Sequence, residues 1–326
     1  MRERMKAAEK CVRFRRRLAA PNCAIGIVAL SASLLLAAVA TAQVPNNPST
    51  QQSQTELSTI TVEAERDRAV LERRVNTFVS GITVAPYQES LARWKKEMPI
   101  CPQVAGLPYL DGEYVLSRFS ETAAAAGASL APTICRPNLY ILVSSVPDEL
   151  IAEWSKRNPW MFGNAGGIKI RQFLHATVPV RVWYNTALFN GDGISCKVYN
   201  EGIPVCEQDA QIAQIRLAAV RDFSSVIVVV DARQTKDLSM GQLAAYIAMV
   251  GLAEIRVDAK LGDAPTILHL FTDSANAPPL GMSSWDAAYL KALYHTEHDD
   301  RTQLLALKTT MINAITLPPD NNDGRK

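Results

Sequence analysis

Apolar residues along the chain gather into runs of two kinds, extended and helical. Residues 226–230 (VIVVV) form an unbroken, mostly β-branched run between Ser225 and Asp231. Such a run predicts a central strand that is buried on both faces. Residues 139–143 (LYILV) predict a second buried strand, and the partly alternating residues 180–188 predict a third.

The helix that follows the strongest strand should be the most deeply buried helix of the chain. Ser239 and Gln242 form the S-x-x-Q pattern of a capping box, which marks its start. We expect it to end near Gly251, because a positive φ costs little at glycine. Nearly every side chain between these signals is apolar, so the helix itself offers no group for chemistry.

Other helices are predicted from apolar residues at helical spacing. Ser283 and Asp286 form a second capping box, Gly127 ends one helix and Pro147 begins another. We therefore predict an α+β or α/β fold, a central mixed sheet packed by helices, in a single globular domain over residues 63–316. The remaining predicted helices cover residues 63–80, 111–126, 148–157 and 303–315.

The two ends of the chain differ in composition from the predicted domain. Residues 1–42 combine a basic start, an apolar run rich in Ala and Ser, and Ala40-Thr41-Ala42, as in a cleaved signal peptide. Residues 43–62 predict a disordered tether, and residues 317–326 a polar tail. We expect a periplasmic or secreted bacterial protein; the alternative is an uncleaved N-terminal membrane anchor.

The charge balance excludes one class of partner. Eight of the 34 basic residues but two of the 32 acidic residues fall within residues 1–42, so the rest of the chain has a net charge of −4. Binding to nucleic acid relies on clustered Lys and Arg. We therefore expect no nucleic-acid partner, and contact with a membrane only if the leader stays attached.

The cysteines agree with export. The predicted leader contains two of the six, which leaves Cys101, Cys135, Cys196 and Cys206. An even number in an oxidising compartment predicts two disulfides, for which three pairings exist. We favour Cys101–Cys135 and Cys196–Cys206, the second of which would staple a β-ribbon. Paired C-x-x-C spacings, typical of zinc sites, are absent from the sequence.

No catalytic constellation stands out in the sequence. His295 and His298 lie three residues apart in an acidic stretch (HTEHDD), which is compatible with a metal site but more typical of a solvated connector. The chain has no G-x-S-x-G pentapeptide and no phosphate-binding glycine loop. We assign no catalytic residue and expect no cofactor. An acidic hydrolase site would need convergence of Asp231, Glu254 and Asp258.

Two loops are the candidate ligand-binding segments. Residues 158–167 (NPWMFGNAGG) place Trp160 and Phe162 beside three glycines, a composition found in ligand lids and in turns whose aromatic residues pack back on the core. Asp231 and Arg233 begin the loop between the central strand and its helix. We take these four side chains as the candidate ligand contacts.

The last third of the chain resembles a family of exported bacterial proteins of unknown function that is itself similar to zincin-type zinc metallopeptidases. The features that carry the resemblance are Val250-Gly251-Leu252 at the end of the capped helix, residues 264–271 (APTILHLF) and residues 283–295 (SSWDAAYLKALYH). Zincins carry H-E-x-x-H before a glycine on this helix. With that glycine at Gly251, the three functional positions fall on Ala244, Ala245 and Ala248. The resemblance thus implies a zincin-like scaffold without its catalyst.

Taken together, these patterns predict an exported, non-catalytic binding or scaffold protein of the cell envelope, which the resemblance would make a degenerate metallopeptidase scaffold. Its partner would be a protein, a peptide or an envelope component. The alternative is a periplasmic hydrolase with an acidic site around Asp231 and Glu254.

Overall fold

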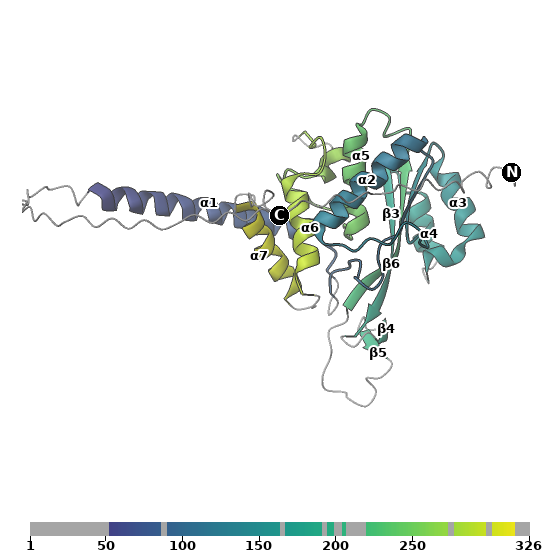
Figure 1. The fold of residues 1–326 in the computed structure, drawn as a ribbon, viewed down its shortest axis with the longest axis horizontal. Coiled ribbons are helices and arrows are strands. Elements are labelled where there is room, and N and C mark those ends of the chain that lie inside the picture. The colour runs from purple at the N-terminus through teal and green to yellow at the C-terminus, as the bar shows by residue number, and fades with distance from the viewer. Residues whose placement is uncertain are drawn as a thin grey trace, which may run out of the picture. The chain divides into compact units, whose positions relative to one another are not determined.

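The computed structural model describes most of the chain after residue 51. The described residues are 52–85, 90–163, 167–190, 194–198, 204–206, 220–272, 277–297 and 302–316, of which 52–65, 198 and 204–206 are described by their backbone alone. Contacts divide the chain into the units Met1–Gln54 and Thr55–Lys326. The fold below is that of the second unit (Figure 1). The predicted signal peptide and polar tail lie outside the described residues.

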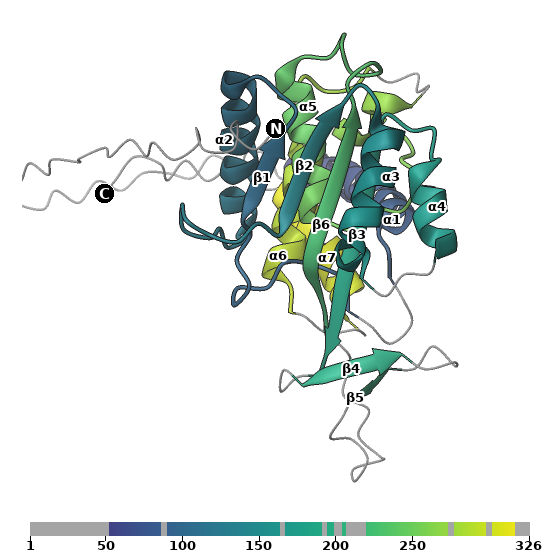
Figure 2. The same cartoon turned by 90° about the vertical axis from the view of Figure 1, so that its right-hand side faces the viewer.

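The centre of the fold is a six-stranded mixed sheet with the order β1-β2-β6-β3-β4-β5 (Figure 2). Strands β1, β2 and β6 are parallel, and β3 runs antiparallel to β6. The mixed sheet and the three strands predicted from apolar runs are confirmed. The strands are β1 (Pro102–Ala105), β2 (Leu139–Ser144), β3 (Val180–Phe189), β4 (Ser195–Val198), β5 (Pro204–Cys206) and β6 (Val220–Asp231).

Helices cover both faces of this sheet (Figures 1 and 2). Val226, Val228 and Val230 of β6 belong to a large core with α1, α2, α5, α6 and α7, whereas Ile227 and Val229 belong to a smaller core with α3, η1 and α4. The prediction that β6 is buried on both faces is therefore confirmed. The helices are α1 (Gln52–Ile82), α2 (Tyr109–Ala126), α3 (Pro147–Arg157), η1 (Pro159–Phe162), α4 (Gly167–Leu174), α5 (Met240–Leu252), η3 (Ile267–Phe271), α6 (Ser284–His295) and α7 (Gln303–Thr316).

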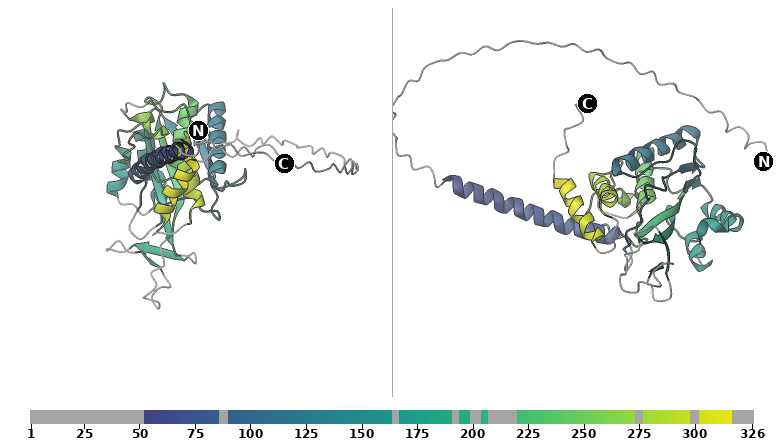
Figure 3. Two further views of the ribbon diagram at one scale, coloured as in Figure 1. Left: turned by 90° about the vertical axis from the view of Figure 1, so that its left-hand side faces the viewer. Right: turned by 60° about the horizontal axis from the view of Figure 1, so that its bottom comes forward.

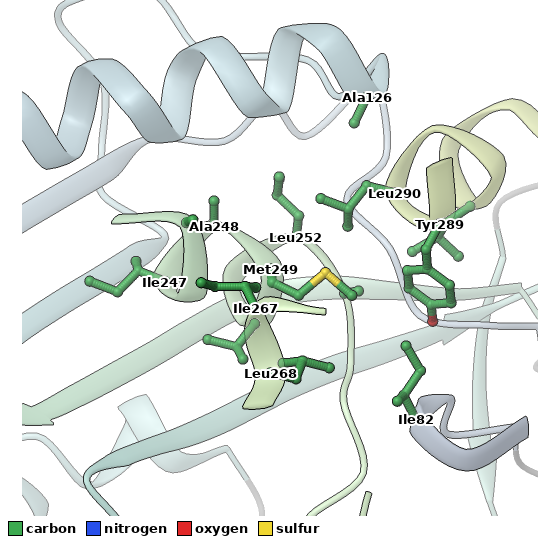
Figure 4. Close-up of a cluster of buried hydrophobic side chains, with 14 of the residues drawn as sticks. Ile82, Ala126, Ile247, Ala248, Met249, Leu252, Ile267, Leu268, Tyr289 and Leu290 are labelled. Carbon is green, nitrogen blue, oxygen red and sulfur yellow. The ribbon is translucent and has the colours of Figure 1, made fainter. Parts of the chain in front are cut away.

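The most deeply buried of these helices is α5, as predicted. Figure 4 shows Ile247, Ala248, Met249 and Leu252 of α5 surrounded by side chains of η3 and α6 and by Ala126 at the end of α2. Both predicted capping boxes are present, at the starts of α5 and α6. The interior of the large core is thus built around a helix whose fully buried side chains are all apolar.

Helix α5 ends at Leu252, one residue after Gly251, so its predicted end is confirmed. The reason given for the glycine is wrong, because Gly251 lies in the last turn of the helix and is not among the glycines with positive φ. A Cβ atom at Gly251 would lie 3.1 Å from Cε2 of Phe119, so the glycine allows α2 to approach α5 closely. The Gly251 carbonyl also accepts a hydrogen bond from Nε1 of Trp94 at 2.8 Å. The physical reason for this glycine is helix packing.

The predicted tether is wrong for residues 52–62, which form the first part of α1. No Gly or Pro interrupts residues 49–80, so nothing in the sequence stops the helix from extending N-terminally. Residues 43–51 lie outside the described residues. The C-terminal end of α1 lies beside α7 (Figure 3). It is tied to the domain by Val75, Phe78, Val79 and Ile82, all fully buried, and by a hydrogen bond from Lys308 Nζ of α7 to Ser80 Oγ.

The structure describes one disulfide where two were expected. Cys101–Cys135 is present, as predicted, at the start of β1. For the second pair, β4 and β5 form the predicted ribbon, and their register places Cys196 opposite Cys206. The side chain of Cys206 lies outside the described residues, so a Cys196–Cys206 disulfide stays a prediction. Among the described helices, none is long and apolar enough to cross a membrane.

Candidate functional site

A pocket of about 730 Å³ beside strand β3 is the candidate site that we consider. Residues 180–184 of β3 form one wall. Residues of α4 lie over one face of the sheet, residues of α5 and η3 lie over the other, and the segment 254–257 lines the pocket as well. We call this hollow the β3 pocket. Its walls are mostly apolar and aromatic, with a few polar groups, as is usual in ligand sites.

The β3 wall is an open strand edge. Strand β4 pairs with β3 only at Leu188 and Phe189, and no other described strand pairs with this edge between Val180 and Ala187. Strand β6 occupies the opposite edge along the whole length of β3. The backbone groups that point away from β6 therefore lie along the β3 pocket.

The register of β3 on β6 identifies these groups. The amide of Asp231 donates to the carbonyl of Pro179 at 2.8 Å, so residues 179, 181 and 183 direct their backbone groups at β6. The alternate residues Val180, Val182 and Tyr184 direct theirs outward. The amide of Val226, opposite Tyr184, donates instead to Asn138 on the β2 side, which agrees with this assignment. Val180, Val182 and Tyr184 therefore each offer a backbone N–H donor and a C=O acceptor to the β3 pocket.

Two tyrosines close the side of the β3 pocket that α5 forms. The hydroxyl of Tyr184 contacts the carbonyls of Val250 and Ala253 at 2.9 and 3.1 Å, which fixes the end of α5 against β3. The ring of Tyr246 packs edge-to-face on Phe271, with centroids 4.8 Å apart. Burial raises the pKa of Tyr246 to about 12 and also raises the pKa of Tyr184. Both phenols are therefore protonated near neutral pH.

The charged residues that line the β3 pocket are Lys169, Arg181, Arg256 and Glu254. The Glu254 carboxylate binds the Arg221 guanidinium with both oxygens, one contact being 3.0 Å. Arg181 pairs with Asp148 at 2.6 Å and Arg256 with Asp258 at 3.2 Å. Lys169 has no ionic partner among the described residues. The lining is therefore net positive, and its one carboxylate is already engaged by a guanidinium.

The Glu254 carboxylate and the two phenols of this lining are poorly placed to act as a general base. A general base needs an available lone pair near the reacting atom, and a nucleophile needs such a base beside it. In the described lining, Glu254 is held by Arg221 and both phenols keep their protons. What the β3 pocket does offer is apolar surface, outward backbone groups and positive charge.

Asp231 and Arg233 form a turn at the end of β6. The Asp231 carboxylate accepts hydrogen bonds from the Arg233 amide, from the Arg233 guanidinium and from Nε2 of Gln234. The hydrogen bonds from Arg233 hold the pKa of Asp231 well below its ordinary range. These contacts hold the Asp231 carboxylate within its own loop. Neither Asp231 nor Arg233 lines the β3 pocket.

Trp160 and Phe162, the aromatic candidates, have opposite environments. Trp160 is 68% exposed, whereas Phe162 is buried and packs against Phe173 and Trp183 at centroid distances of 6.2 and 5.3 Å. Phe173 and Trp183 line the β3 pocket. Phe162 therefore supports the pocket wall from behind, and Trp160 lies on the surface of η1.

The acidic hydrolase site is not assembled. Asp231 and Arg221, the partner of Glu254, lie near opposite ends of the 12-residue β6, which at about 3.3 Å per residue places them roughly 30 Å apart. Asp258 pairs with Arg256. Asp231 and Glu254 therefore do not face a common cleft.

The remaining candidates fall outside any constellation for chemistry. His295 lies at the end of α6, where its Nδ1 is 2.8 Å from the Lys291 carbonyl, and His298 lies outside the described residues. No cluster of three metal-ligating side chains occurs in the part of the chain that the structure describes. Ala244, Ala245 and Ala248, where the zincin resemblance places its ligands and base, are buried against the core.

Comparisons with known proteins identify no relative of this chain. No family model, no curated protein and no solved structure matches this chain.

Sequence reasoning missed the β3 pocket although it predicted β3 itself. The signal that was available is the alternation of Val180, Val182 and Tyr184 with Arg181 and Trp183. Alternation shows two faces of a strand, but it does not show whether a neighbour covers the strand's edge.

Proposed function

We propose that this chain is an exported, non-catalytic binding protein of the cell envelope, and that its ligand occupies the β3 pocket. The observation that carries the proposal is the lining of this pocket. Apolar and aromatic side chains surround outward backbone groups of Val180, Val182 and Tyr184, and the lining carboxylate of Glu254 is bound by Arg221. Such a surface recognises a ligand without reacting with it.

Export to an oxidising compartment is the second part of the proposal. The Cys101–Cys135 disulfide supports it, because disulfides persist mainly outside the reducing cytosol. The basic and apolar pattern of residues 1–42 supports it as well. A zincin-type ancestry is not needed, since the buried alanines of α5 provide no metal ligand.

Filling the β3 pocket should abolish ligand binding. Ala176 lines the pocket, so Ala176→Trp introduces a large ring there, whereas Thr177→Trp adds the same ring at an exposed neighbour outside the lining. We expect wild type and Thr177→Trp to bind a member of a panel of peptides and soluble cell-wall fragments with equal affinity, and Ala176→Trp to lose at least about 90% of the binding. Isothermal titration calorimetry measures the binding, because each variant adds a tryptophan to the five of the chain and would disturb a fluorescence signal.

The same panel also tests the absence of catalysis. Binding that is unchanged in Ala176→Trp would move the ligand site elsewhere. Hydrolysis of panel peptides by zinc-loaded protein, lost on treatment with a chelator, would overturn the proposal of a non-catalytic protein.

A further inference from the structure

The outward backbone groups of β3 define the kind of ligand more narrowly than the pocket volume does. Val180, Val182 and Tyr184 present N–H and C=O groups at every second residue along an edge that no described strand covers. Their spacing is that of a strand, and the complementary spacing belongs to the extended backbone of another polypeptide. A sugar or a compact metabolite matches one or two of these groups, while a peptide matches all of them.

The environment of this edge makes pairing favourable. Val180 is 7% exposed, and Val182 and Tyr184 are partly buried between the α4 side and the α5 side of the β3 pocket. Polar backbone groups in a partly desolvated environment gain more free energy from a hydrogen-bond partner than groups on an open surface do. The hollow beside β3 lies where the next strand of the sheet would lie.

The two sides of the β3 pocket differ in chemistry, which predicts a ligand whose apolar and acidic side chains alternate along its length. Tyr246, Val250 and Phe271 form an apolar wall on the α5 side. Lys169 lies on the α4 side and has no ionic partner among the described residues. Side chains of a docked strand would point to these two sides in turn. Apolar residues suit the first side and a carboxylate suits the second.

We propose that the β3 pocket binds an extended peptide segment that adds as a strand to the β3 edge, with apolar residues toward Tyr246 and an acidic residue toward Lys169. This inference rests on the proposed function, because it names the ligand of the same pocket. Recognition would be by backbone pairing for affinity and by alternate side chains for specificity.

The experiment begins with wild-type protein lacking residues 1–42, panned against random 12-residue peptides displayed on phage. The tightest peptide is synthesised with a single N-methyl group at each position in turn. Only alternate amides of a docked strand face β3, so we expect losses of about tenfold or more at every second position and less than about threefold at the positions between.

Two pairs of variants locate the interaction on β3 and Lys169. Val182→Pro removes an N–H that points into the β3 pocket, whereas Val182→Ala keeps this amide. We expect Val182→Pro to weaken binding at least tenfold more than Val182→Ala does. Lys169→Glu should weaken binding about tenfold, and Lys291→Glu, at an exposed position of α6, should change it less than twofold.

The outcomes separate the peptide inference from the proposed function. Binding that is lost in Ala176→Trp but shows no alternation in the N-methyl series would leave the β3 pocket as the site and overturn strand addition. A wild-type dimer that Val182→Pro converts to a monomer would show that a second copy of the chain covers the edge, which also overturns it. Absence of any ligand for wild type would defeat the proposed function itself.

Discussion

Replacing Gly106 by alanine should destabilise the domain by more than about 4 kcal/mol. Gly106 follows β1 with φ of 92°, and a Cβ atom there would lie 1.9 Å from the carbonyl oxygen of Val143. Val143 belongs to β2, where it pairs with Val230 of β6 directly after the last β1–β2 pair at Leu142, so this oxygen has little room to move. The expected result is insoluble protein or a strongly lowered midpoint of denaturant unfolding, followed by circular dichroism.

Gly112→Ala is the matched control for this substitution. In helix α2 the nearest atom to an added Cβ is Cγ1 of Val104 at 3.7 Å, an ordinary contact. Alanine favours a helix interior over glycine by roughly 0.5–1 kcal/mol, so this variant should be as stable as wild type or slightly more stable. Equal unfolding midpoints for the two variants would show that β1 and β2 do not approach as described.

Asp286→Ala should be the second severe substitution, with a loss of about 3–5 kcal/mol. The fully buried carboxylate accepts hydrogen bonds from the Thr266 hydroxyl, the Ile267 amide at 2.8 Å and the Ser283 amide at 3.1 Å. Alanine leaves these donors without an acceptor inside the core. The free energy of unfolding in urea, extrapolated to water, measures the loss.

The other capping box provides the control for Asp286. Gln242 occupies the equivalent third position of α5 but is partly exposed, so Gln242→Ala should cost no more than about 1 kcal/mol. Similar losses for the two alanine variants would contradict the role of burial.

Asp286 also predicts a pH dependence with a definite sign. Burial raises the pKa of Asp286 above its ordinary 3.8, despite the hydrogen bonds that it accepts. The folded protein therefore holds this proton more tightly than the unfolded chain does, and the stability that this provides is present below pH 3.8 and lost as the pH rises through the folded-state pKa. Asp286→Asn lacks this titration, so the stability of wild type relative to Asp286→Asn should fall over that range.

Features of the fold that depend on neighbours in the sequence were predictable. The aliphatic run of β6, the shorter run of β2 and the two capping boxes each carry a local signal, and all four are present. A central mixed sheet was predicted as well, but the succession of strands and helices did not show which strands run parallel. These elements have one structure because their own side chains favour it.

Features that depend on distant contacts were not predictable. Gly251 is explained by Phe119 of another helix, and the start of α1 at Gln52 has no sequence signal. The acidic residues Asp231 and Glu254 are near in sequence but are separated by the length of β6 and engaged by Arg233 and Arg221. The edge of β3 is open because no other described strand pairs with it there. The residues of β3 itself carry no signal that shows whether its edge is paired.

The most direct measurement of the open edge is amide hydrogen exchange along β3. In the free protein we expect the amides of Val182 and Tyr184 to exchange at least about a hundredfold faster than those of Arg181 and Trp183, which point at β6. A bound peptide should then protect Val182 and Tyr184 and leave the other two unchanged. Equal protection of all four amides in the free protein would contradict an open β3 edge, and with it the binding site.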